Sequence, residues 1–209
     1  MHSKRPWKSL GVQNWQGEFP DGLAGAPRPS ASLVASSSRN LEAGNDAPAG
    51  AEPGGAGLCS SENVERLARI LQSEASVGNE IERAAVAWTV LNRMKRNATD
   101  HVRDVASAYA TNQEATDMMR KIARDVLSGK RPDPTGGCTH YYSPRSMPKE
   151  DERTTGYDTG GGVELVPPLT KPTYRPGWVL DERLTYTPIP GVRPHFFMFY
   201  KVEGAGKVN

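Results

Sequence analysis

The sequence has few cysteines and no long apolar run. Cys59 and Cys138 are the only two cysteines in 209 residues, so at most one intramolecular disulfide can form and a disulfide-rich scaffold is excluded. No apolar stretch approaches the roughly 20 residues that a transmembrane helix needs. The sequence therefore predicts no membrane span.

Several catalytic and ligand-binding motifs are also absent. The spacing of His101, His140 and His195 matches no zinc motif, and there is no Cys-x-x-Cys or His-Glu-x-x-His element. No Gly-x-Ser-x-Gly element supports a serine hydrolase. The net charge of +2 argues against a dedicated nucleic-acid binder. We expect neither a metal nor another cofactor.

Residues 1–58 form a low-complexity tail, rich in Ala, Gly, Pro and Ser. Such a composition buries too little apolar surface to offset its ordering entropy, which predicts an extended or disordered segment. Trp7, Trp15 and Phe19 stand out near its start. They are either stray aromatics in a solvated tail or the anchors of a peptide that docks on a protein partner.

Three helices are predicted at the start of a second region, residues 59–209. Ser60 and Ser61 are suitable N-caps for a first helix that ends at about Ser73 or Ala75. A second helix spans about residues 80–97, with Ile81, Ala84, Ala85, Trp88 and Leu91 on its buried face. A third spans about residues 112–128, ends before Gly129 and carries Ala115, Met118, Met119, Ile122 and Val126 inward.

Short strands and loops follow the helices. Residues 139–143 and the run HFFMFYK at 195–201 read as strands. Between them, about residues 145–177 form an irregular, polar insertion with Gly and Pro turns. Helices followed by short strands indicate an α+β domain that is mostly helical.

Glu74 interrupts an apolar helix face. Val64, Leu67, Leu71 and Glu74 follow one another at steps of three, four and three residues, which places them on one side of the first helix. A carboxylate therefore stands where the pattern calls for an apolar side chain. Burial raises the pKa of a carboxyl group, and a carboxyl that stays protonated near neutral pH is what a general acid requires. The alternative is an ordinary surface Glu paired with a nearby Arg such as Arg69.

Three stretches resemble the cell wall hydrolase family of spore cortex-lytic enzymes. They read LARILQSEAS at 67–76, GNEIERAAVAWTVLNR at 78–93 and DPTGGCTHYYSP at 133–144. The resemblance covers residues 64–144, and 193–200 more weakly. It implies a small lysozyme-like domain that cleaves the bond between N-acetylmuramic acid and N-acetylglucosamine in peptidoglycan.

The resemblance also implies roles for particular residues. Glu74 aligns with the family's catalytic Glu, and Tyr141 and Tyr142 align with a segment that borders the glycan groove. Glu80 matches an acidic position of the family's loop, and we assign it either to the surroundings of the bound substrate or to a structural role. A lytic transglycosylase is favoured, because no second carboxylate belongs to a motif; a muramidase-type hydrolase is the other outcome.

Two further pieces are interpreted as structural. Asn92 and Arg93 end the second helix, where capping or an ion pair, for example with Asp104, accounts for them. Residues 133–137 read as a rigid turn that presents Tyr141 and Tyr142.

The expected site of action is the periplasm or the cell wall. The basic residues of the N-terminus are followed by no apolar run, so we expect no signal peptide. Delivery by a phage particle, a lysis system or a secretion machine would then be needed. The alternative function is a structural or tethering component of a virion or secretion machine, with a degenerate, glycan-binding lysozyme-like domain.

Overall fold

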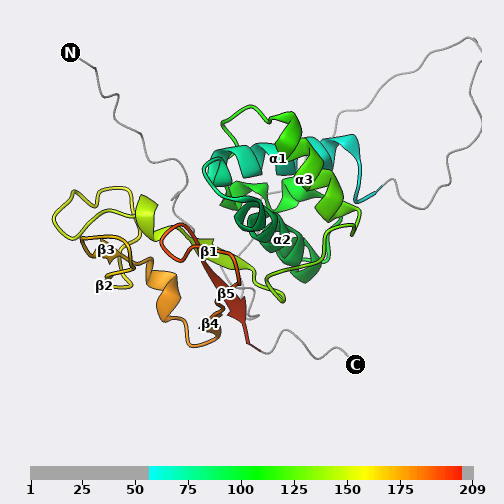
Figure 1. Cartoon of the computed structure of the whole chain (residues 1–209). Helices are drawn as coiled ribbons and strands as arrows, with labels where there is room; N and C mark the ends of the chain where they lie inside the picture. Colours follow the sequence, from blue (N-terminus) through cyan, green and yellow to red (C-terminus); the bar gives the residue numbers. More distant parts are fainter. Residues whose placement is uncertain (1–56, 204–209) are drawn as a thin grey trace, which may run out of the picture. The chain divides into compact units, whose positions relative to one another are not determined.

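The computed structural model describes residues 57–203 (Figure 1). These residues form three α-helices, α1 (Ser61–Ala75), α2 (Glu80–Arg96) and α3 (Asp117–Leu127). They also form five short strands, β1 (His140–Tyr142), β2 (Val163–Glu164), β3 (Thr173–Tyr174), β4 (Leu184–Tyr186) and β5 (Met198–Val202). The predicted α+β class is confirmed. The predicted tail, with Trp7, Trp15 and Phe19, lies outside the described residues except for its last two positions.

Helix α1 has the predicted bounds. The Ser60 side chain accepts a hydrogen bond from the backbone N–H of Asn63 at 3.2 Å, which satisfies one of the free donors at the helix start. Val64, Leu67 and Leu71 are buried, as the periodicity predicts. The helix ends at Ala75, one residue after Glu74.

Helix α2 begins with a capping box. The Asn79 side chain accepts the backbone N–H of Glu82 at 2.9 Å, and the Glu82 carboxylate accepts the backbone N–H of Asn79 at 2.7 Å. The predicted inner face is confirmed except at Ile81, which is 42% exposed. Ile81 lies in the first turn, where its tip approaches Gly191 instead of the helical core.

Helix α3 is shorter than predicted. It begins at Asp117 rather than near residue 112, and the Thr116 hydroxyl caps it by accepting the N–H of Met119 at 3.4 Å. Because residues 112–116 are not helical, the inward face starts later than expected. Met119, Ile122 and Val126 are buried, whereas Met118 is half exposed and was wrongly assigned to the core.

The three helices pack against one another around one apolar core, with α1 in contact with both α2 and α3 (Figure 1). The chain's last part completes this core with Ile189, Phe196, Phe197 and Phe199. The helices and the C-terminal part of the described chain therefore share one apolar core.

A three-stranded antiparallel sheet has the strand order β1-β5-β4. Its central strand, β5, lies near the end of the described chain and pairs with β1, which follows the helices. Tyr141 of β1 pairs with Phe199 of β5. Successive side chains of a strand point to opposite faces, so Tyr141 packs against the helical core while Tyr142 belongs to a second apolar cluster with Leu184 and Tyr200. This alternation decides which tyrosine can reach Glu74.

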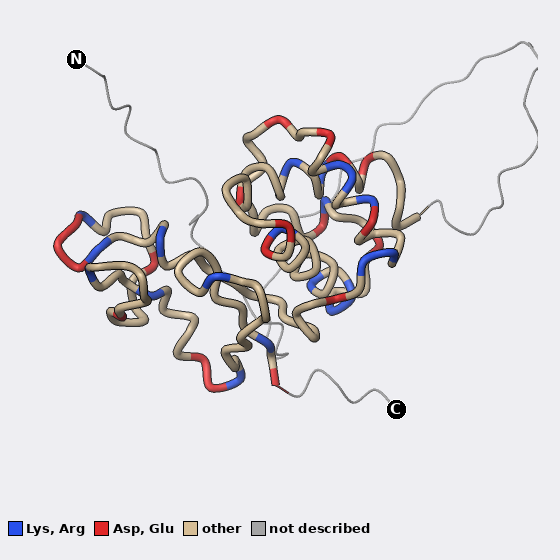
Figure 2. Tube along the Cα trace, viewed as in Figure 1, with Lys and Arg blue, Asp and Glu red and all other residues tan. Residues whose placement is uncertain are grey.

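The predicted insertion is largely irregular and holds the β2–β3 hairpin-like pair. Short 3₁₀ helices lie at Val102–Asp104, Ala106–Ala108, Pro144–Ser146 and Gly177–Leu180. Cys59 and Cys138 are both free, so the conceivable disulfide is not formed. Basic and acidic residues are interleaved along the described chain (Figure 2). Within residues 57–203, no helix has both the length and the apolar character to cross a membrane.

Candidate functional site

Glu74 lies in the last turn of α1 and is half-buried. Its Oε1 atom accepts a hydrogen bond of 2.7 Å from the backbone N–H of Ala110, in the segment between α2 and α3. A backbone N–H can only donate, so Oε1 is held as an acceptor. In the neutral carboxyl group the acidic proton is therefore carried by Oε2.

The surroundings of Glu74 favour the protonated form. Burial raises its pKa from the ordinary value of 4.5 to about 7, although the Ala110 N–H and the Tyr141 hydroxyl each lower it in part. At neutral pH the group is thus divided between acid and carboxylate. A carboxyl with such a pKa can donate a proton and take one back within a single reaction.

Tyr109 and Tyr141 flank this carboxyl group. Their rings stack with centroids 6.3 Å apart and an interplanar angle of 21°. Both hydroxyls are buried and make no hydrogen bond of normal geometry within residues 57–203. Burial raises the pKa of both phenols, and the nearby Glu74 charge adds to the rise. The Arg93 guanidinium lies 5.2 Å from the centroid of the Tyr109 ring.

Tyr142 is not brought to Glu74. Its hydroxyl donates a hydrogen bond to the Glu164 carboxylate, and its ring packs edge-on against Trp178 with centroids 5.9 Å apart. The two neighbouring tyrosines of the sequence motif therefore pack in two different clusters, Tyr141 against the helical core and Tyr142 in the second apolar cluster. A substrate-binding role for Tyr142 stays a prediction, as it does for Tyr141.

Glu80 lies at the exposed start of α2. It pairs with Arg131, whose hydrogen bond holds the pKa of the Glu80 carboxyl below its usual value. Its hydrogen bond and ion pair join it to Arg131 and not to Glu74. Its assignment to the substrate's surroundings likewise stays a prediction.

Glu82, two residues further on, is the fully buried acidic residue of this helix. Its carboxylate accepts hydrogen bonds from Arg193 Nε at 2.8 Å and Nη2 at 2.7 Å, and from the Arg193 backbone N–H at 3.0 Å. Sequence reasoning missed this pair. The Asn79-x-x-Glu82 spacing of a capping box was the available signal.

Asn92 does not cap α2 as predicted, because the helix continues to Arg96. The Asn92 side-chain amide donates to Asp133 Oδ2 at 3.0 Å, to Thr135 Oγ1 at 3.2 Å and to the Cys138 carbonyl at 3.1 Å. These bonds fix the turn that leads into β1 and hence the position of Tyr141. Arg93 donates to the Thr139 carbonyl at 3.0 Å, whereas Asp104 pairs with Arg103 instead of the expected Arg93.

An α+β domain that keeps a carboxyl group partly protonated at neutral pH is equipped for acid–base chemistry. Residues 79–159 match the family model described as Cell Wall Hydrolase. This match supports a cell wall hydrolase for residues 79–159, and Glu74 lies outside it, on the N-terminal side of Asn79. Neither a search of curated proteins nor a search of solved structures found a match.

Proposed function

We propose that the protein cleaves the glycan strands of peptidoglycan, with Glu74 as the catalytic acid and base. The observation that carries the proposal is the position of Glu74 in the last turn of α1, where the Ala110 N–H binds Oε1 and burial raises the pKa to about 7. The Cell Wall Hydrolase match over residues 79–159 supports the substrate class. A Glu turned outward into an ion pair would favour a binding module; Glu74 instead accepts the Ala110 N–H.

The first step breaks the bond between N-acetylmuramic acid and N-acetylglucosamine. Glu74 donates its Oε2 proton to the glycosidic oxygen, which leaves as a hydroxyl group of N-acetylglucosamine. Positive charge of oxocarbenium type develops at C1 of N-acetylmuramic acid. Glu74 is now a carboxylate, and Ala110 and Tyr141 favour this charged form.

The second step is proposed to be intramolecular. The Glu74 carboxylate takes the proton from the 6-hydroxyl of N-acetylmuramic acid, and that oxygen bonds to C1. The product is a 1,6-anhydro sugar, and Glu74 regains its proton for the next cycle. This route, that of a lytic transglycosylase, needs one carboxyl group.

A hydrolase of muramidase type would need a second carboxylate about 5 to 9.5 Å from the first. No second carboxylate of the sequence belongs to a motif, and Glu74 Oε1 is held by the Ala110 N–H. This favours the single-carboxyl route.

Digestion of purified peptidoglycan by the wild type and by Glu74→Gln, with mass analysis of the released muropeptides, tests the proposal. Glutamine keeps the shape of the side chain and removes the titratable proton. We expect anhydro-muropeptides from the wild type and at least about a hundredfold less from the variant. Reducing-end products would point to a hydrolase. Equal release by both proteins, or release by neither, would contradict the role of Glu74. The route by which the protein reaches the wall stays a prediction.

A further inference from the structure

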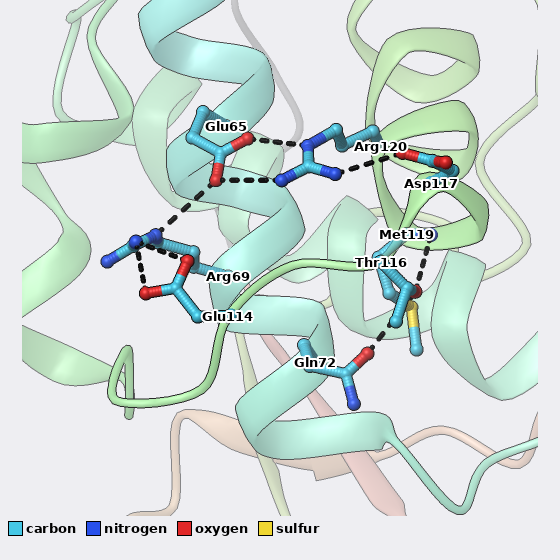
Figure 3. Close-up of polar contacts among 8 residues, drawn as sticks. All are labelled: Glu65, Arg69, Gln72, Glu114, Thr116, Asp117, Met119 and Arg120. Atoms are coloured by element: carbon cyan, nitrogen blue, oxygen red, sulfur yellow. Dashed lines mark hydrogen bonds and ion pairs between the residues drawn. The ribbon is translucent and has the colours of Figure 1, made fainter.

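The segment of residues 109–116, which we call the strap, runs beside the second half of helix α1. It contacts α1 through four polar interactions, all between Arg69 and Glu74. These are Ala110 N–H to Glu74 Oε1 at 2.7 Å, Gln113 N–H to Ser73 Oγ at 3.1 Å, Thr116 Oγ1 to Gln72 Oε1 at 3.3 Å, and Arg69 Nη2 to Glu114 Oε1 and Oε2 at 2.6 and 2.7 Å. Figure 3 shows Arg69 turned toward Glu114, and Gln72 toward Thr116.

Both ends of the strap are fixed. The C-terminal end of the strap leads directly into helix α3. Helix α3 is joined to α1 by the ion pair between Arg120 Nε and Glu65 Oε2 at 2.7 Å (Figure 3). Glu65 also accepts from Arg69 at 3.4 Å, so one network includes α3, α1 and Glu114. At its start, the Tyr109 ring packs against the helical core and Tyr141.

The middle of the strap has little else to hold it. Residues 111–114 are exposed and have no regular secondary structure. Exposed ion pairs and single hydrogen bonds each stabilise a fold only weakly. The strap therefore depends on several weak contacts with the second half of α1, and a segment of this kind opens at low cost when they are removed.

We propose that Arg69, Gln72 and Ser73 are positioning residues that hold the strap over Glu74. They keep the Ala110 N–H on Oε1 and keep water away from the carboxyl group. The effect on catalysis rests on the proposed function, whereas the effect on the protonation of Glu74 does not.

The direction of that effect follows from the groups that face Glu74. The strap provides the Ala110 N–H and the ring of Tyr109, β1 provides Tyr141, and Arg93 of α2 faces Tyr109. Burial is the largest cause of the raised pKa and outweighs the Ala110 hydrogen bond and the nearby Tyr141 hydroxyl. Opening the strap removes the shielding and one hydrogen bond together, so the pKa of Glu74 falls toward its ordinary value.

The test is the full chain with Arg69→Ala, Gln72→Ala and Ser73→Ala combined. Alanine has the highest helix propensity, so α1 is expected to form. The matched control is Glu62→Ala with Arg66→Ala, which removes an exposed 2.9 Å ion pair from the same helix that makes no contact with the strap. Titration of ¹³C-labelled glutamate carboxyls by NMR, with the Glu74 signal assigned by its loss in Glu74→Gln, reports the protonation directly.

We expect the pKa of Glu74 to fall by about one unit in the triple variant and to stay at the wild-type value in the control. One unit corresponds to a tenfold lower ratio of acid to carboxylate, so the alkaline limit of glycan cleavage should move down by the same unit. Glu114→Gln, which acts from the strap side, should give a smaller shift in the same direction.

An unchanged or raised pKa in the triple variant, or an equal fall in the control, would overturn the proposal. Because the titration needs no substrate, it separates this proposal from the proposed function. Peptidoglycan cleavage by Glu74→Gln at the wild-type rate would contradict the catalytic role of Glu74 and leave the comparison of pKa values intact.

Discussion

Arg193 neutralises the buried carboxylate of Glu82 and joins the start of helix α2 to the segment that precedes β5. Burial by itself would raise the pKa of Glu82, but the hydrogen bonds from Arg193 and Asn79 outweigh it and hold the pKa below the usual value. The Arg193 guanidinium also stacks on Phe196, 3.7 Å from the ring centroid. The pair thus ties the apolar end of the chain to the helical core.

Arg193→Ala should therefore destabilise the fold strongly. Removing one partner of a buried pair leaves an uncompensated charge, at a cost of about 3 kcal/mol. Glu82→Gln should cost less, because the neutral amide needs no counter-charge. Urea unfolding of the two variants at pH 7 measures the difference, and an Arg193→Ala variant as stable as the wild type would contradict this view.

The pH dependence of the same pair has a defined sign. A carboxyl whose pKa is lowered in the folded state stabilises the fold above the unfolded pKa of about 4.5. This contribution is lost as the pH falls below about 4.5 and through the lowered folded pKa. Between pH 5 and pH 3, the free energy of unfolding should therefore fall less in Arg193→Ala than in the wild type. Acid-unfolding curves of the two proteins would record this difference.

Local patterns predicted the helices well. The steps of three and four residues from Val64 to Glu74 and the N-cap at Ser60 gave the correct bounds of α1. The start of α3 was placed too early because Asn112 to Thr116 show no strong helix breaker. Their conformation is decided by contacts with α1, such as Thr116 with Gln72 at 3.3 Å, which lie outside any local pattern.

The candidate site was predictable only in part. Helical periodicity identified Glu74, but its partner Ala110 lies 36 positions further on and carries no functional side chain. The contact uses the backbone, so no residue type signals it. The choice between Tyr141 and Tyr142 likewise depended on which face of β1 meets the helices, and a three-residue strand contains too little alternation to decide that.

The two adjacent tyrosines provide a matched comparison. Tyr141→Phe removes a hydroxyl that lowers the pKa of Glu74, so that pKa should rise above about 7. Tyr142→Phe removes a hydroxyl on the opposite face of β1 and should leave Glu74 unchanged. The pKa can be followed by the NMR titration of labelled glutamate. Equal shifts in both variants would mean that the faces of β1 do not separate the two hydroxyls.

Glu74 should make the wild type less stable at alkaline pH. Its folded pKa of about 7 exceeds the ordinary value of 4.5, so between these values the folded state binds more protons than the unfolded state. The free energy of unfolding must then fall as the pH rises through this interval. The full difference of pKa corresponds to at most about 3 kcal/mol.

Glu74→Gln removes this titration, and glutamine has no charge to bury. The variant should therefore match the wild type near pH 4.5 and exceed it by up to about 3 kcal/mol at pH 8. Urea unfolding of both proteins at several pH values measures how the free energy of unfolding changes with pH. If this free energy changed with pH in the same way in both proteins, Glu74 would have an ordinary pKa. It would then be ionised at neutral pH and would be a poor proton donor there.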